Sequence, residues 1–279
     1  MMKPRVNIVL GGSGLIGKSL RKITNDNKNF IYICGSKKIK GYKKFNLNSD
    51  FKNFPYKNVD KCFFFASPRI LKKNLNEKKF YQEYKWLKKI IYNLKINKMI
   101  YLSSSSIYYS NNHVIGINKK KCENLIIENK KKFKEHQIWR PFNLIGTHYN
   151  EHSDHFHNIL FKKMFIMKYG FSLFRGNVND LRGYSRVEDF VRVLFDYSKT
   201  NTSFVKDFGN QKLCKIGDVV KLYNKYYFKL FKKNFCYEFI SKKININRIK
   251  KNKNNFYKNL DSLKIIDQYL KNSLNVKKV

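Results

Sequence analysis

The sequence has few acidic residues, few prolines and almost no alanine. Asp and Glu number 19 against 59 Lys and Arg, there are 4 prolines, and Ala66 is the only alanine. The lysines are spread along the chain among abundant Asn, Ile, Phe and Tyr, residues whose codons are rich in A and T. We interpret the net charge of +40 as the mark of an A/T-biased genome with lysine as the usual surface residue, and we predict no specific nucleic-acid site. Salt-sensitive binding to polyanions is still expected.

Long apolar runs and cysteine motifs are also missing. No apolar run is long enough to cross a bilayer, and Met1–Pro4 lead directly into a core segment, so we expect no signal peptide and no membrane span. The five cysteines are far apart and form no C-x-x-C pair. This usage fits free thiols in a reducing compartment and predicts a cytoplasmic protein. The 279 residues suffice for one α/β domain with a smaller lobe.

The most informative stretch runs from Val6 to Gly17. An apolar run ending at Leu10 predicts a buried parallel strand, and an amphipathic segment from Leu15 predicts a helix. Gly11 and Gly14 lie between the strand and the helix, and Gly17 lies within the helix. This order is the phosphate-binding unit of dinucleotide folds, where the first glycine permits the turn, the second admits a pyrophosphate and the third lets the helix approach the strand. A glycine turn without a ligand is the alternative interpretation.

Strand-like and helix-like segments alternate through the first half of the chain. Strands are predicted at 30–35, 43–47, 61–67, 98–106 and 137–141, with helices at 75–94 and 117–133. Such alternation predicts a doubly wound parallel sheet. Further helices are expected at 157–168, 187–198, 216–230 and 260–270, with strands at 171–174 and 204–208.

We therefore predict an α/β protein of the Rossmann type. Residues 1–141 would form an NAD(P)-binding core. Residues 142–279 would supply the remaining core elements, interleaved with a small C-terminal substrate-binding lobe, and the Lys/Asn-rich stretch at 242–255 would be exposed.

Several motifs occur in the order typical of one enzyme family. They are Gly11–Gly17, Asn46-Leu47, Phe65-Ala66-Ser67, the serine-rich Tyr101–Tyr108, Trp139-Arg140-Pro141-Phe142-Asn143, Arg182–Asp189 and Leu260–Lys264. Together they resemble the extended short-chain dehydrogenase/reductase family, in particular its NAD-dependent nucleotide-sugar epimerases and dehydratases. The resemblance covers most of the chain.

The resemblance implies a bound nicotinamide dinucleotide. The positions it places on the cofactor are Gly11, Ser13, Gly14, Leu15, Ile16, Gly17, Ser36, Lys37, Asn46, Leu47, Ala66, Ser67, Lys119 and Pro141. NAD sites usually carry an acidic residue after the second strand, but this chain has Cys34-Gly35-Ser36-Lys37 there. A hydroxyl and a cation suit a 2′-phosphate, which favours NADP over NAD. Alternatively, Lys37 is only a solvated lysine.

The catalytic residues implied by the resemblance are Ser104 and Lys119. Ser104 would orient a substrate hydroxyl, and Lys119 would bind the cofactor ribose. The family's proton-transferring tyrosine lies four residues before the lysine, where this chain has Ile115. Tyr108, Tyr109 and His113 are nearby substitutes. The alternative is that Tyr108 and Tyr109 pack as a pair beside the sheet and that His113 is a solvated histidine.

The implied substrate is a nucleotide-linked sugar. Asn143 and Arg182 would contact its diphosphate, since Arg suits bidentate phosphate binding, and Ser104 would contact the sugar. An ion pair of Arg182 with Glu188 or Asp189 is the alternative. We thus expect an NAD(P)-dependent epimerase, dehydratase or reductase, or else a catalytically inactive dinucleotide- or nucleotide-sugar-binding protein of the same fold. Family members often form homodimers through the helices at 75–94 and 117–133, although the lysines of the second helix would oppose this.

A histidine cluster suggests a metal, but we predict none. His148, His152, His155 and His157 occur close together with Glu151 and Asp154, and these residue types bind zinc. The segment is predicted to be a loop and helix start, where Ser153 and Asp154 can act as caps.

Overall fold

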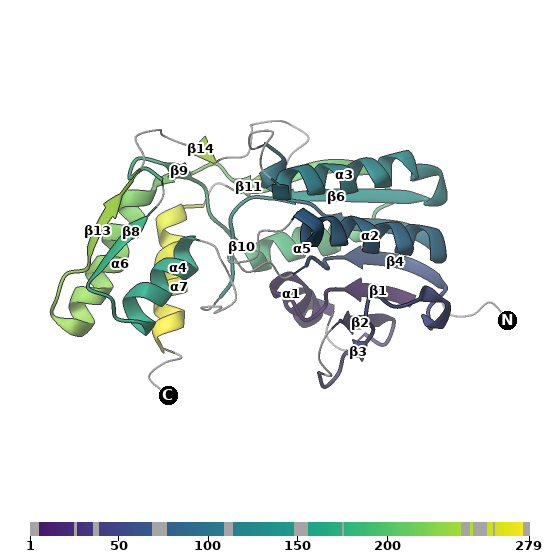
Figure 1. Cartoon of the computed structure of the whole chain (residues 1–279), viewed down its shortest axis with the longest axis horizontal. Coiled ribbons are helices and arrows are strands. Elements are labelled where there is room, and N and C mark those ends of the chain that lie inside the picture. Colours follow the sequence, from purple (N-terminus) through teal and green to yellow (C-terminus); the bar gives the residue numbers. More distant parts are fainter. Residues whose placement is uncertain are drawn as a thin grey trace. The chain divides into compact units, whose positions relative to one another are not determined.

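The computed structural model describes residues 6–24, 27–35, 39–68, 77–108, 114–147, 156–174, 176–240, 246–247, 256–258 and 260–275 (Figure 1). The chain divides into two compact units. Unit 1 comprises Met1–Pro141 and Val191–Lys206, and unit 2 comprises Phe142–Phe190 and Asp207–Val279.

Unit 1 is built on a twisted sheet. Its strands are β1 (Val6–Leu10), β2 (Phe30–Cys34), β3 (Lys43–Lys44), β4 (Asn58–Phe64), β5 (Lys95–Leu102) and β6 (Glu135–Pro141). The order is β6-β5-β4-β1-β2-β3, and all of these neighbours pair in parallel. β11 (Phe204–Asn210) lies next to β6, and it begins in unit 1 and ends in unit 2. The strand order reverses at β1, so the predicted doubly wound parallel sheet is confirmed.

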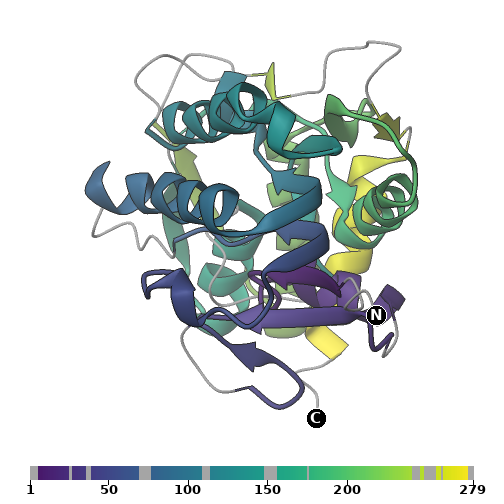
Figure 2. The same cartoon turned by 90° about the vertical axis from the view of Figure 1, so that its right-hand side faces the viewer.

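Helices cover both faces of this sheet. α2 (Glu77–Asn93) and α3 (Val114–Glu128) pack against each other, and Figure 2 shows them on the same side of the strands. The apolar residues of these two helices pack in the main core of unit 1. Alternate residues of the strands, such as Leu10 and Phe64, belong to the same core. α1 (Leu15–Thr24) and the second half of α5 (Val187–Ser198) contact residues of the opposite face, where Thr24 bonds Tyr32 and Phe195 meets Phe30.

Several segments differ from the sequence prediction. The strand predicted at 98–106 ends at Leu102, and Ser105–Tyr108 forms a 3₁₀ turn because the Ser104 side chain accepts the backbone N–H of Ser106 at 3.1 Å. The helix predicted at 117–133 is α3, which starts earlier and ends at Glu128, with a separate 3₁₀ turn at Lys130–Lys132.

In the described part of unit 2, helices pack around an aromatic core. These are α4 (Phe156–Phe161), α6 (Ile216–Phe231) and α7 (Ser262–Asn275), which bury Phe161, Tyr223 and Tyr269. The helix predicted at 157–168 is α-helical only to Phe161 and continues as one π-helical segment, Lys162–Ile166.

Short strand pairs complete unit 2. β7 (Leu144–Ile145) pairs with β10 (Ser185–Arg186), β8 (Phe171–Phe174) with β13 (Cys236–Phe239), β9 (Leu181–Arg182) with β12 (Cys214–Lys215) and β14 (Ile246–Asn247), and β15 (Phe256–Lys258) with the end of β11. Most of the stretch predicted to be exposed, 242–255, lies outside the described residues.

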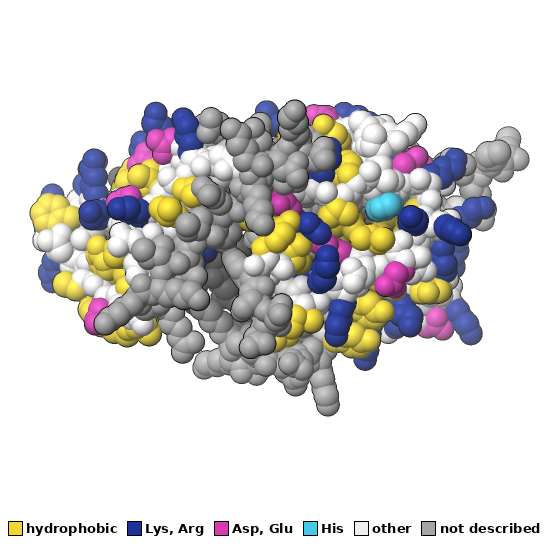
Figure 3. All heavy atoms as spheres, turned by 90° about the horizontal axis from the view of Figure 1, so that it is seen from above, with side chains coloured by type: hydrophobic (Ala, Val, Ile, Leu, Met, Phe, Trp, Pro, Cys, Tyr) yellow, Lys and Arg dark blue, Asp and Glu magenta, His cyan; other side chains and the backbone are white. Residues whose placement is uncertain are grey.

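Basic side chains of the described residues gather in no single stripe on the face drawn in Figure 3. On the face drawn in Figure 3, Lys and Arg side chains are scattered among apolar and acidic ones. All five cysteines are free thiols, and four are buried. Within the described ranges, no helix has the length and hydropathy of a membrane span.

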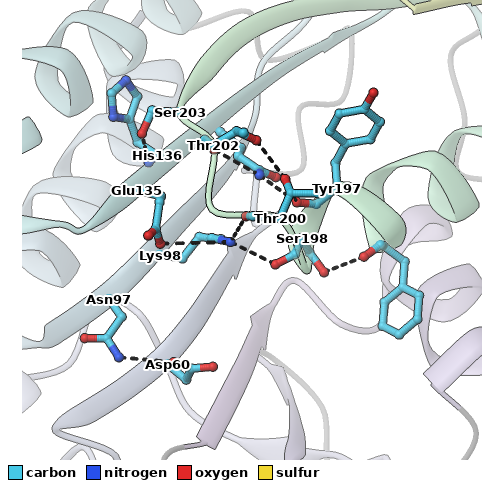
Figure 4. Close-up of polar contacts among 12 residues, drawn as sticks. Asp60, Asn97, Lys98, Glu135, His136, Tyr197, Ser198, Thr200, Thr202 and Ser203 are labelled. Carbon is cyan, nitrogen blue, oxygen red and sulfur yellow. Dashed lines mark hydrogen bonds and ion pairs between the residues drawn. The ribbon is translucent and has the colours of Figure 1, made fainter.

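A buried lysine near the start of β5 attaches the end of α5 to the sheet (Figure 4). Lys98 Nζ donates to Ser198 O at 3.0 Å and to Thr200 O, and it lies 3.9 Å from Glu135 Oε2. Ser198 O ends the last turn of α5 and Thr200 O follows it, where intrahelical donors run out. Lys98 therefore satisfies acceptors that the helix itself leaves open.

Gln137 and His136, one strand away on β6, attach the segment that follows α5. Gln137 Nε2 donates to Tyr197 O at 2.8 Å and Thr202 O at 3.2 Å. The His136 N–H donates to Ser203 Oγ at 3.0 Å (Figure 4). Five hydrogen bonds from two strands thus fix residues 197–203 at this end of the sheet.

Lys98→Met is expected to lower the free energy of unfolding by about 1–3 kcal/mol near neutral pH, because buried carbonyls lose their donor. Burial lowers the pKa of Lys98 below its ordinary 10.5. The folded state therefore binds fewer protons there than the unfolded chain, and the stability that Lys98 contributes rises as pH increases toward 10.5. Urea denaturation at several pH values measures the free energy of unfolding of both proteins. The difference between wild type and variant should widen as pH rises.

Lys95→Met is the matched control, since Lys95 is an exposed lysine of the same strand. It should change stability little at any of these pH values. A gap for Lys98→Met that narrows with rising pH would contradict the account.

Candidate functional site

A tight glycine turn joins the carboxyl end of β1 to α1. Gly11 has φ of +82°, and a Cβ built on it would lie 2.6 Å from Ala66 N, just after β4. A Cβ on Gly17 would lie 2.6 Å from Gly12 O. Both glycines are therefore required by the close packing of the turn against its neighbours.

Gly14 has no such packing reason. A Cβ there would meet only Gly11 O, at 3.3 Å, and Gly14 and Leu15 are exposed. The Gly14 N–H donates to Gly11 O at 3.0 Å, and Leu15 begins α1. The backbone N–H groups of the first turn of a helix have no intrahelical acceptors, and its amino end carries partial positive charge. Ser13 and Ile16 are half-buried beside it. This geometry can bind a phosphate group.

Four side chains meet at the carboxyl ends of β4 and β5. Lys119 Nζ, from α3, donates to Glu83 Oε1 at 2.7 Å and to Leu102 O at 2.9 Å. Glu83, from α2, also accepts from Tyr101 Oη at 2.8 Å and from Ser67 Oγ at 3.0 Å. We call Ser67, Glu83, Tyr101 and Lys119 the Lys119 network. Ser67 and Lys119 are predicted site residues and Tyr101 begins the serine-rich motif, but Glu83 was not predicted.

The network contains one carboxylate and no second base. Burial and the Glu83 carboxylate raise the pKa of Tyr101 well above its ordinary value, so its phenol stays protonated and donates. Burial and the same carboxylate raise the pKa of the adjacent Cys122 thiol to about 12. Glu83 is thus the single charged acceptor for all three donors around it.

Ser104 and Ile115 lie at the same edge of unit 1. Ser104 Oγ accepts the Ser106 N–H, and its hydroxyl proton has no acceptor in the described part of the chain. Ile115 is exposed and lies one helical turn before Lys119 on α3. The expected proton-transfer position therefore carries a side chain that cannot transfer a proton. Tyr109 and His113 lie outside the described residues.

A second buried ion pair joins α3 to β6. Arg140 Nε and Nη2 donate to the two oxygens of Glu123 at 2.9 and 2.6 Å, and Ser103 Oγ donates to Glu123 Oε1 at 2.5 Å. Burial lowers the pKa of Arg140, but the hydrogen bonds and charge of Glu123 outweigh it and raise the pKa overall. Arg140 Nη1 also donates to Tyr108 Oη at 2.8 Å. Tyr108 therefore has an arginine partner.

Arg140 stands in a motif quoted from the sequence, but its partner Glu123 was not predicted. A signal was available, since an arginine in a buried strand needs a carboxylate and this chain has few. Pro141, expected at the cofactor, follows Arg140 and is half-buried at the end of β6.

The residues expected on the adenosine side have different environments. Asn46 is exposed, and its Oδ1 accepts the Asn48 N–H at 3.0 Å. Leu47 is 7% exposed and belongs to the core of unit 1. Ala66 is half-buried against the glycine turn. Ser36 and Lys37, which carried the preference for NADP, lie outside the described residues.

The two expected diphosphate residues are neighbours in unit 2. Asn143, whose φ is +40°, donates from Nδ2 to Gly183 O at 3.0 Å, next to Arg182. Arg182 Nε is buried and has no hydrogen-bond partner among the residues that the structure describes. The side-chain hydroxyls of Tyr184 and Ser185 are also buried without a partner among the described residues; both belong to the Arg182–Asp189 motif, but no role was predicted for them.

Among the residues that the structure describes, Arg182 forms no ion pair. Asp189 instead pairs with Arg186, with Nε and Oδ2 2.9 Å apart, and Glu188 accepts from Thr147. The alternative of a structural pair between Arg182 and either acid is therefore wrong. Within the described residues, Arg182 Nε is thus a buried donor without an acceptor.

His157 is a core residue. Its ring packs edge-on against Tyr269, with centroids 5.1 Å apart, and it is 2% exposed. His148, His152 and His155 lie outside the described residues. In the described portion of the chain, no group of three or more His, Cys, Asp or Glu side chains is arranged to hold a metal ion.

No protein-family model and no curated protein matches this sequence. Solved structures match it over nearly its whole length. MoeE5 in complex with UDP-glucuronic acid and NAD has a TM-score of 0.71 at 15% identity, covering 98% of this chain and 99% of that chain. The UDP-N-acetylglucosamine 4-epimerase from Bacillus cereus has a TM-score of 0.71 at 17% identity, with 99% and 98% covered.

TunA, an NAD-dependent NDP-hexosamine 5,6-dehydratase of tunicamycin biosynthesis, is similar with a TM-score of 0.74 and 14% identity, covering 99% of this chain and 98% of that chain. These similarities show that the chain has the fold of nucleotide-sugar epimerases and dehydratases. The resemblance read from the sequence is confirmed at the level of the fold.

Arg140→Met is expected to lower the free energy of unfolding by about 3 kcal/mol or more, because it leaves the Glu123 carboxylate buried without its counter-charge. Arg186→Met is the matched control, since its pair with Asp189 is exposed and should contribute only about 0–1 kcal/mol. Guanidinium denaturation of both variants measures the difference. Equal losses would contradict the assignment of Arg140–Glu123 as the pair that stabilises this edge.

Proposed function

We propose that the protein binds NAD or NADP at the carboxyl edge of the unit 1 sheet and acts on a nucleotide-linked sugar as an epimerase, dehydratase or reductase. The observation that carries the proposal is the glycine turn, where Gly14 leaves the first turn of α1 open although packing does not require a glycine there. The Lys119 network lies at the same edge. Similar folds are found in proteins described as complexes with UDP-sugars and NAD.

The described residues fit a dinucleotide. The backbone from Gly11 to Gly17 would bind the pyrophosphate, and Ala66 and Ser67, which follow β4, would line its path. Asn46 would lie on the adenosine side, while Leu47 would act only through its backbone because its side chain is in the core. Pro141 would contribute at the nicotinamide end. Lys119 Nζ donates two hydrogen bonds in the protein, so a third N–H can donate to a ribose hydroxyl.

The bound nicotinamide would supply hydride acceptance and return. Ser104 would orient the reacting hydroxyl of the sugar, since its own proton has no protein acceptor in the described chain. Lys119 would hold the cofactor ribose. Ile115 cannot take the substrate proton, so a residue other than the family's tyrosine must do so.

In unit 2, Asn143 and Arg182 would bind the diphosphate of the nucleotide sugar. The buried, unpartnered Nε of Arg182 is a donor in need of an acceptor, and a phosphate oxygen is a strong one. We further propose a preference for NADP, because Cys34-Gly35-Ser36-Lys37 offers a hydroxyl and a cation and no acid.

Gly14→Ala is expected to keep the fold and weaken binding of NADH and NADPH by about tenfold or more, equivalent to about 1.4 kcal/mol. The added methyl would meet only Gly11 O in the protein but would occupy the approach to the first turn of α1. Fluorescence titration with each reduced nucleotide measures the affinity and tests the preference for NADP.

Gly170→Ala is the matched control, because nothing lies within 4 Å of a Cβ at that position. It should leave both nucleotide affinities unchanged. If Gly14→Ala binds the nucleotides as tightly as wild type, the glycine turn is not the phosphate site.

A catalytically inactive binding protein of the same fold is the second candidate, and Ile115 is the observation that favours it. For the leading function we expect wild type to turn over UDP-sugars slowly and Ile115→Tyr to raise the rate by about a hundredfold, since general acid–base catalysis contributes about that much or more. Epimer formation is followed by chromatography.

Ile115→Phe is the control, because it adds an aromatic ring without a hydroxyl. If only Ile115→Tyr is active, while wild type and Ile115→Phe are inactive, the leading function is wrong. The second candidate then takes its place.

A further inference from the structure

Glu83 is a buried carboxylate in a chain where acids are scarce. Only 19 residues of the protein are Asp or Glu, and Glu83 is 2% exposed. Its two oxygens accept from Lys119, Tyr101 and Ser67 at 2.7, 2.8 and 3.0 Å. A carboxylate so enclosed cannot reach a substrate. Its effect must act through the groups bonded to it.

Lys119 is the charged member of that set. It is 8% exposed, and an ammonium removed from water is costly unless an opposite charge is beside it. Glu83 supplies that charge. Leu102 O accepts a second N–H at 2.9 Å, and the ammonium also lies 5.2 Å from the centroid of the Tyr101 ring. These contacts fix the direction of the remaining N–H.

The network lies on the side of the sheet where the nicotinamide half of a dinucleotide belongs. In doubly wound folds the dinucleotide crosses the point where the strand order reverses, and its adenosine ribose lies at the end of the second strand. Here the order reverses at β1, so the other half extends toward β4 and β5. Leu102 ends β5, and Ser67 follows Ala66, which packs on Gly11.

The two redox forms of nicotinamide differ in charge. The oxidised ring is a cation and the reduced ring is neutral, so a buried ammonium without a counter-charge would disfavour the oxidised form. In a site shielded from water such a charge acts strongly over several ångströms. The Glu83 carboxylate, 2.7 Å from Lys119 Nζ, cancels most of that field.

We propose that Glu83 is a positioning residue that holds Lys119 and, as its counter-charge, lets this site bind the oxidised, cationic form of the dinucleotide. This inference rests on the proposed function. It adds a selectivity between redox forms, set by a residue that touches neither cofactor nor substrate.

The test compares the affinity of Glu83→Gln and wild type for the oxidised and reduced nucleotides. NADH and NADPH binding is measured by fluorescence, and NAD⁺ and NADP⁺ binding by competition. Glu83→Gln keeps the size of the side chain and removes its charge. The ratio of affinities, oxidised over reduced, should fall by about tenfold. Loss of a purely structural contact would weaken both forms alike and leave the ratio unchanged.

Tyr101→Phe is the matched control, since it removes one hydrogen bond to Glu83 and leaves both charges in place. Its ratio should equal that of wild type. Lys119→Met keeps the inference testable if Glu83→Gln does not fold. Lys119→Met leaves the Glu83 carboxylate without its counter-charge and should raise the ratio of affinities. The double variant, which has neither charge, should have a ratio close to that of wild type.

An unchanged ratio in Glu83→Gln, or a fall in Lys119→Met, would overturn the inference while leaving nucleotide binding intact. Wild type that binds neither redox form would instead refute the proposed function, and the inference with it.

Discussion

Two buried carboxylates hold the carboxyl edge of the unit 1 sheet together. Glu83 binds Lys119 at 2.7 Å, and Glu123 binds Arg140 through two hydrogen bonds of 2.9 and 2.6 Å. In a chain of net charge +40, cations are plentiful and buried anions are rare, so each carboxylate determines which cation is taken into the interior. α2, α3 and β6 are joined at this edge by charge as well as by apolar packing.

The fold could be predicted because its signals are local. The apolar run before Gly11 and the helical periodicity after it are properties of neighbouring residues, and α5 begins and ends where the sequence predicts. The predicted ends of elements were wrong where a side chain competes for the backbone hydrogen bonds. β5 ends at Leu102 because Ser104 bonds the backbone of Ser106.

The partners within the site could not be predicted in the same way. Glu83 and Lys119 are 36 residues apart on different helices, and their pairing depends on how α2 and α3 pack. Arg140 and Glu123 are 17 residues apart and lie on a strand and a helix, with the end of α3, a 3₁₀ turn and the start of β6 between them. Leu47 was expected beside the cofactor, but its side chain completes the core. Motif positions could be recognised from the sequence, whereas the direction and partners of each side chain required the fold.

We propose that this edge binds a nucleotide, and one of its positions is unusual for catalysis. The glycine turn, Ser104 and Lys119 are the residues on which the proposal rests, whereas the position expected to move a proton is Ile115. The proposed binding of the sugar and the proposed catalysis both depend on cofactor binding. Mass spectrometry of the nucleotide released when purified, salt-washed protein is denatured tests it most directly. The account predicts NAD or NADP in near-stoichiometric amount. An empty protein that also takes up no added NADH or NADPH would contradict it.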